Sequence, residues 1–168
     1  LVDGDHPELS AALERVRQGR RERTQAMLER LQSLGVPITP EDLAAVSDTE
    51  SPGRPHVAAA LVALGVVRDP KEAFQRFLGR GRPAYVDRYR IPAEQAIQLI
   101  LEARGLPALA HPGLVADESI IPELVAQGLQ GLEAYHVEHT PGQVARYRDM
   151  AEQLGLLVVG GSDSHGPA

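Results

Sequence analysis

Three residues near the ends of apolar segments have side chains that bind metal ions: His111, Asp163 and His165. Asp163 and His165 stand two positions apart in GGSDSHG, which follows the apolar run LGLLVV, and His111 begins HPG directly after LPALA. Imidazole nitrogens and carboxylate oxygens suit manganese, zinc, iron or magnesium, and such an ion activates water for hydrolysis. Together the three residues predict a metal site.

The segments that must position these ligands alternate between helix and strand over residues 92–168. Helical periodicity and short apolar runs recur in turn, with helices predicted at about 92–104, 120–126 and 141–154 and strands at 106–110, 131–136 and 156–159. Such alternation with short connections is typical of right-handed crossovers and a parallel sheet, either open or closed into a barrel. The predicted fold class is therefore α/β.

Candidate metal ligands or acid–base groups also occur at the end of the second predicted strand, where they are Glu133, Tyr135, His136, Glu138 and His139. The carboxyl ends of parallel strands form one rim of a sheet or barrel, where sites are built. We therefore expect these residues to share a rim with the ligands that follow the first and third strands. For any single histidine the alternative is an ordinary polar loop.

Residues 1–91 have a different pattern, which predicts helices and no strand. Apolar residues recur at helical spacing over about 7–34, 55–64 and 70–79, and a glycine follows or ends each of these segments. Gly19 lies inside the first segment, where we expect it to bend or split the helix.

Composition excludes several classes of protein. The 168 residues are 43% hydrophobic with a net charge of −6, which favours a globular core and argues against a surface coated with nucleic-acid-binding charge. There is no cysteine, so disulfides and thiolate metal sites are excluded. No apolar run approaches the roughly 18 residues of a membrane span, and the first residues do not resemble a signal peptide. A soluble cytoplasmic protein with no membrane partner is expected.

Arginines form a second group of possible binding residues. Arg54 and His56 stand at the start of a predicted helix in GRPHVA, where free backbone N–H groups favour an anion. Arg80 and Arg82 lie in LGRGRPAYV, and paired guanidinium groups bind a phosphate bidentately. A solvated loop and an ordinary helix start explain the same residues equally well. The arginines between positions 15 and 23 are expected on a solvated helix face, with a nucleic-acid patch as the alternative.

Five motifs in order, GRPHVAAALV, FLGRGRPAYV, ALAHPG, GLEAYHVEHTPGQ and GGSDSHG, resemble the PHP (polymerase and histidinol phosphatase) superfamily, and most closely its TrpH-like metal-dependent phosphoesterases. The resemblance implies a distorted (βα)7 barrel with an inserted, mainly helical domain. Residues 1–91 would be that insertion and its flanks, and residues 92–168 the last three βα units. It also implies two or three manganese, iron or zinc ions and the hydrolysis of phosphate esters by metal-activated hydroxide. The implied substrates are nucleoside 3′,5′-bisphosphates or short oligonucleotides degraded in the 5′ to 3′ direction.

Motif by motif, the resemblance implies metal ligation by His111, Asp163 and His165, with Asp163 and His165 in the catalytic centre. The residues that it assigns to the substrate phosphate are Arg54, Arg82 and His56. The family's opening His-x-His motif, which supplies further ligands, does not occur in the sequence. We therefore expect the chain to be part of a longer enzyme and to be inactive alone.

Three other interpretations stay open. A metal hydrolase of the amidohydrolase type would act on carbon–nitrogen bonds, although the arginine pair argues against it. The helical half would instead be a module that docks nucleic acid or protein through the arginines between positions 15 and 23. The third interpretation is a degenerate, metal-free paralogue without catalysis. The sequence indicates no oligomeric state.

Overall fold

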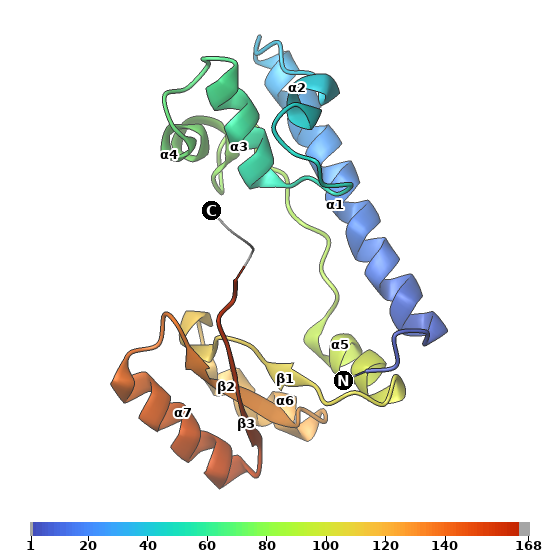
Figure 1. Ribbon diagram of the computed structural model, residues 1–168, viewed down its shortest axis with the longest axis vertical. Helices are drawn as coiled ribbons and strands as arrows, with labels where there is room; N and C mark the ends of the chain where they lie inside the picture. Colours follow the sequence, from blue (N-terminus) through green and yellow to red (C-terminus); the bar gives the residue numbers. More distant parts are fainter. Residues whose placement is uncertain (1, 165–168) are drawn as a thin grey trace. The chain divides into compact units, whose positions relative to one another are not determined.

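The chain folds into two compact units, which the computed structural model describes over residues 2–164. The helical unit comprises residues 11–90. The sheet unit comprises residues 91–164 together with the N-terminal residues up to Ser10. Figure 1 labels the helices and strands of both units and colours them along the chain.

No strand occurs among residues 2–91, as the sequence predicts. The helices of this part are α1 (Pro7–Ser33), α2 (Pro40–Ala44), α3 (Arg54–Ala63), α4 (Pro70–Ala73) and the π-helix η1 (Phe74–Leu78). Helix α1 runs unbroken through Gly19, where we expected a bend or a split. A Cβ atom at Gly19 would lie 2.7 Å from Cβ of Tyr89, so the glycine permits close packing and does not break the helix. None of the helices formed by residues 2–164 has the length and apolar character needed to cross a bilayer.

Local signals set the helix ends in the helical unit. Thr39 caps α2 in a capping box, because its hydroxyl accepts from the Asp42 N–H at 3.3 Å and the Asp42 carboxyl accepts from the Thr39 N–H at 2.8 Å. Gly35 and Gly65 follow α1 and α3 with φ of 81° and 68°, a backbone conformation that glycine adopts without steric cost. The core of the unit is apolar and includes Met27, Leu31, Ile38, Leu61 and Leu78.

The sheet unit alternates helix and strand. Its elements are α5 (Ala93–Glu102), β1 (Ala108–Leu109), α6 (Ile121–Ala126), β2 (Gly131–His136), α7 (Pro141–Leu154) and β3 (Leu157–Gly161), with short 3₁₀ turns at Pro112–Leu114 and Glu118–Ile120. The strands form one parallel sheet in the order β1-β2-β3, with Leu109 opposite Leu132 and His136 opposite Gly161. The predicted α/β class with a parallel sheet is confirmed. Closure into a (βα)7 barrel and the division at residue 91 into insertion and barrel stay predictions.

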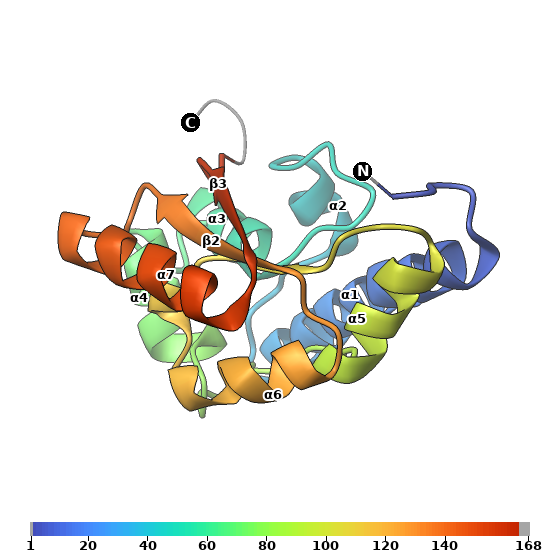
Figure 2. The same cartoon turned by 90° about the horizontal axis from the view of Figure 1, so that it is seen from below.

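One face of the sheet is covered by helices, and Figure 2 shows α6 and α7 together on that side of the strands. Leu132 and Ala134 of β2 are fully buried in one apolar cluster with Tyr147 of α7 and Ile121 of α6. Thr140 caps the start of α7, and its hydroxyl accepts from the Gln143 N–H in a second capping box. The apolar cluster thus packs β2 against α6 and α7.

Candidate functional site

The three strand ends of the sheet unit bring together polar side chains that the sequence places on one rim. His111 follows β1 by two residues, His136 is the last residue of β2, and Asp163 follows β3 by two residues. The rings of His111 and His136 have centroids 5.5 Å apart, and His136 Nε2 lies 4.0 Å from Asp163 Oδ2. The rim is therefore a cluster of imidazole and carboxylate groups within the sheet unit.

The backbone of His111 is held by the second strand. Its N–H donates to Oε2 of Glu133 at 2.6 Å, and Glu133 is only 9% exposed. His111 adopts φ of 33°, in the left-handed region that non-glycine residues rarely enter, so this hydrogen bond helps to fix a strained turn. On the other side, a Cβ atom at Gly161 would lie 2.7 Å from Glu133 Oε1. The glycine of the third strand thus leaves the space that this carboxyl group occupies.

His139 holds the turn after His111 from a second direction. The N–H of Gly113 donates to His139 Nε2 at 3.2 Å, and His139 Nδ1 lies 3.0 Å from the carbonyl oxygen of Ala134. Because Nε2 accepts, the neutral ring carries its proton on Nδ1 and donates it to Ala134. His139 is also buried against the ring of Tyr147, with centroids 5.0 Å apart. It therefore ties the His111 turn to β2 and α7.

Tyr147 extends this contact chain to the loop before α6. Its hydroxyl donates to Oε1 of Glu118 at 2.7 Å, and Arg146 pairs with the other oxygen of Glu118. Burial, followed by the hydrogen bond to Glu118, raises the pKa of the Tyr147 hydroxyl above its ordinary value. The neutral Tyr147 hydroxyl therefore serves as a hydrogen-bond donor to Glu118.

A divalent ion would find suitable donor types at this rim, and their arrangement fits it in part. The His111 ring and the Asp163 carboxyl group have nitrogen and oxygen donor atoms of the kind that manganese, iron and zinc accept. Among residues 2–164, no three histidine, aspartate or glutamate side chains are arranged to hold an ion. The third predicted ligand, His165, lies outside the described residues. His111 and Asp163 are thus suitable ligands for a site that needs further donors.

The phosphate-binding residues predicted from the sequence lie in the helical unit. Arg54 begins α3, and its guanidinium carbon lies 5.7 Å from the centroid of the Phe74 ring and 5.8 Å from that of Tyr85. Among residues 2–164 it makes no ion pair with a carboxylate. His56 Nδ1 accepts the Gly53 N–H at 3.0 Å and so closes the start of the same helix. A guanidinium stacked on aromatic rings and free of a carboxylate partner is available to an anion.

Arg82 has a more open position. It is exposed, and its backbone N–H donates to the carbonyl oxygen of Gly79 at 2.9 Å, which forms a tight turn after η1. Arg80 is exposed on the same turn. The structure thus leaves the guanidinium groups of both arginines accessible to solvent.

The arginines between positions 15 and 23 behave in two ways. Arg17 and Arg21 pair with Glu14 along the exposed face of α1, with the Arg21 contact at 2.6 Å. Arg23 points inward, and its Nε donates to the carbonyl oxygen of Val86 at 2.7 Å. Burial, together with the nearby charge of Arg54, lowers the pKa of Arg23 from its ordinary value. Arg17 and Arg21 therefore lie on a solvated helix face, whereas Arg23 makes a structural hydrogen bond to the backbone of Val86.

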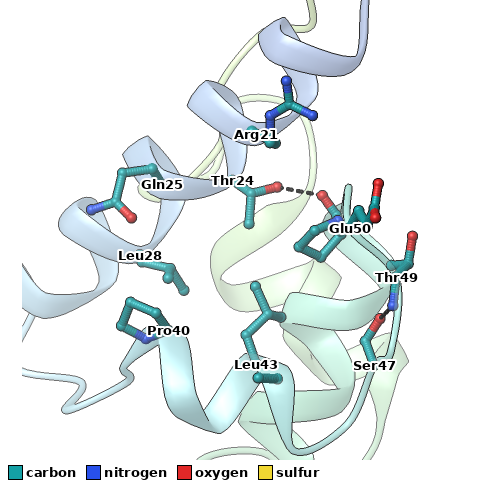
Figure 3. Close-up of a pocket in the computed structure, with 11 residues that line it drawn as sticks. Arg21, Thr24, Gln25, Leu28, Pro40, Leu43, Ser47, Thr49 and Glu50 are labelled. Atoms are coloured by element: carbon teal, nitrogen blue, oxygen red, sulfur yellow. Dashed lines mark hydrogen bonds between the residues drawn. The ribbon is translucent and has the colours of Figure 1, made fainter.

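Figure 3 shows a pocket of about 280 Å³ in the helical unit, between α1 and the segment of residues 47–52. Leu28 and Leu43 line its apolar part and Arg21 lies at its edge. The Thr24 hydroxyl donates to the carbonyl oxygen of Pro52 at 2.7 Å and joins the two sides. The predicted phosphate-binding residues Arg54, His56 and Arg82 do not line this pocket.

The sequence predicted Glu133, His136 and His139 on the rim as candidate metal ligands or acid–base groups, but it did not predict their hydrogen bonds. Their hydrogen bonds depend on the sheet register, which includes an irregularity between Glu133 and Tyr135. The only sequence signal was the density of ionisable residues in EAYHVEH. Their contacts make Glu133 and His139 supports of the His111 turn.

Comparisons with known proteins point to metal-dependent phosphoesterases, although no family model matches the chain. The 3′,5′-nucleoside bisphosphate phosphatase of Chromobacterium violaceum is 31% identical over 172 residues, which cover 99% of this chain and 60% of that protein. The 5′-3′ exoribonuclease Rnm of Escherichia coli is 29% identical over 178 residues, which cover 99% of this chain and 58% of the relative. The chain therefore spans about three fifths of the length of these curated relatives.

Two solved structures match nearly the whole chain, and their names differ. A protein described as a metal-dependent phosphoesterase from Bifidobacterium adolescentis matches with a TM-score of 0.82 at 33% identity, over 98% of this chain and 60% of the other. A structure named an amidohydrolase from Chromobacterium violaceum, with bound sulfate and no metal, matches with a TM-score of 0.81 at 31% identity, over 99% of this chain and 61% of the other.

Proposed function

We propose that the chain is the larger part of a metal-dependent phosphoesterase of the PHP superfamily, TrpH-like in kind, which removes phosphate from nucleotides or degrades short oligonucleotides. The observation that carries the proposal is the meeting of His111, His136 and Asp163 at the carboxyl ends of three parallel strands. Relatives named as a bisphosphate phosphatase and as exoribonucleases match along nearly the whole chain, which supports the same chemistry.

Each residue has a defined role in this proposal. His111, Asp163 and His165 bind divalent ions, two or three of manganese, iron or zinc, with further ligands from outside residues 2–164. Bound ions of this kind activate water and neutralise charge on phosphoryl oxygens. Asp163 and His165 also belong to the catalytic centre, where they hold the ions next to the phosphate group that is hydrolysed.

The helical unit contributes the phosphate contacts in this proposal. Arg54, stacked on Phe74 and Tyr85 and free of a carboxylate partner among residues 2–164, binds a substrate phosphate. Arg82 and His56 assist it. In the same proposal, residues 1–91 are the inserted domain and its flanks, and residues 92–168 are the last three βα units of a barrel. The enzyme works in the cytoplasm.

The test is phosphate release by the full-length protein with added manganese. The substrates are a nucleoside 3′,5′-bisphosphate and a short 5′-phosphorylated RNA, and the matched variants are Asp163→Asn, which keeps the size of the side chain, and Arg54→Lys, which keeps the charge. We expect release from at least one substrate, loss to background in Asp163→Asn, and a raised KM in Arg54→Lys because lysine lacks the bidentate fork. Full activity in Asp163→Asn would contradict the proposal.

An amidohydrolase is the second candidate, because one matching structure has that name. It predicts hydrolysis of amide bonds and no phosphate release by the same metal-loaded protein. A parallel assay on a panel of N-acyl amino acids distinguishes the two activities.

A further inference from the structure

His136 has an unusual combination of burial and missing hydrogen bonds. Its side chain is 1% exposed, and among residues 2–164 its Nε2 atom has no hydrogen-bond partner. Asp163 Oδ2 lies 4.0 Å from this atom, which is beyond hydrogen-bond range. Buried polar atoms are paired in native proteins as a rule, so an unpaired one at a rim of ligand-like residues is a place where a ligand supplies the partner.

The hydrogen bond of the other ring nitrogen, Nδ1, shows whether Nε2 needs a donor or an acceptor as its partner. The backbone N–H of Glu138 donates to His136 Nδ1 at 3.2 Å. A nitrogen that accepts carries no proton, so in the neutral ring the proton lies on Nε2. A metal ion bound to Nε2 would displace this proton and leave the one proton of the neutral ring on Nδ1, where it would face the Glu138 N–H. His136 is therefore a hydrogen-bond donor at the rim, in contrast to the ligand role expected of His111.

We propose that the Nε2–H of His136 donates a hydrogen bond to a phosphoryl oxygen of the substrate. This inference rests on the proposed phosphoester chemistry, which would place such an oxygen at the rim beside His111 and Asp163. A phosphoryl oxygen is an anionic acceptor, and hydrogen bonds to anionic acceptors are the strong ones. The ring is held for this task by the Glu138 N–H and by contact with the ring of His139, whose centroid lies 5.2 Å away.

Two substitutions separate the two nitrogens. In His136→Asn the amide group reaches the position of Nδ1 and can still accept from Glu138, but no donor reaches the position of Nε2. In His136→Gln the longer side chain places its NH₂ group near the former Nε2. The two variants are alike in polarity, so a difference between them reports the Nε2 donor.

The probe is inorganic phosphate, measured by calorimetry on full-length, zinc-loaded protein. Zinc is used because the Asp163 carboxylate would repel an oxyanion unless a bound ion neutralises it. We expect phosphate affinity to fall about 10-fold or more in His136→Asn, the effect of one hydrogen bond to a charged group, and to stay within about 3-fold of the parent in His136→Gln. Zinc content should be equal in all three proteins.

Nitrogen-15 NMR of the parent tests the tautomer without any variant, and it should show the proton of neutral His136 on Nε2. A proton on Nδ1, a loss of zinc in His136→Asn, equal phosphate affinity in His136→Asn and the parent, or equal weakening in both variants would each overturn the inference. A protein that binds phosphate through His136 but cleaves no phosphoester would uphold it and overturn the proposed function instead.

Discussion

Replacing Glu133 with alanine should loosen the turn that carries His111. The Glu133 carboxyl group accepts the His111 N–H at 2.6 Å, and the donor is partly buried. Removing the acceptor leaves that N–H unsatisfied, which costs about 1–3 kcal/mol of the free energy of unfolding. Glu133→Gln is the matched control, because its amide oxygen can accept the same N–H, and its cost should be below about 1 kcal/mol.

The assay is urea unfolding followed by circular dichroism, with the free energy compared at a constant m-value. A second perturbation reaches the same carboxyl group from the other side, because the Cβ atom of Gly161→Ala would lie 2.7 Å from Glu133 Oε1. Its effect should therefore not add fully to that of Glu133→Ala in the double variant. Equal stabilities of Glu133→Ala and Glu133→Gln, or full additivity with Gly161→Ala, would refute the role given to this hydrogen bond.

Three further predictions concern the scaffold. Thr140→Ala should lower the free energy of unfolding by about 1 kcal/mol through loss of the cap on α7, whereas Thr140→Ser should retain most of it; equal losses in urea unfolding would contradict this. Leu61→Ala should cost about 2–5 kcal/mol, because Leu61 is fully buried in the helical core, and a loss below 1 kcal/mol would show that the core there is not packed as described. The raised pKa of Tyr147 means that the fold favours the neutral phenol, so this contribution to stability is complete below about pH 10 and is lost as pH rises through the folded pKa. The ultraviolet titration of the parent minus that of Tyr147→Phe should therefore have a midpoint above 10, and a midpoint at or below 10 would be contrary to the burial of this hydroxyl.

Much of the fold follows from local sequence. The helix at residues 141–154 and the strand at residues 131–136 were predicted because each depends on residues a few positions apart. Strand β1 is shorter than its apolar run, with only Ala108 and Leu109 paired, because a strand extends only where a neighbour bonds to it. The π-helix η1 also escaped prediction, since apolar periodicity cannot distinguish it from an ordinary helix.

Some features of the candidate site also followed from the sequence, and others did not. That His111 and Asp163 would both lie at the rim beside His136 followed from strand polarity, because parallel strands have their carboxyl ends on one side. The bond from His111 to Glu133 and the unpaired nitrogen of His136 depend on register and on backbone angles, which no spacing in the sequence specifies. The stacking of Arg54 on Tyr85 likewise joins residues far apart in the chain.

The most direct test of the central claim is the dependence of phosphate release on bound metal. The full-length protein is stripped with a chelator, assayed on a nucleoside 3′,5′-bisphosphate, reloaded with manganese and assayed again, beside His111→Ala treated in the same way. The phosphoesterase proposal predicts that activity disappears with the metal and returns with it in the parent, and that it does not return in His111→Ala at the same manganese concentration. Undiminished phosphate release by the stripped protein, or full recovery in His111→Ala, would contradict it.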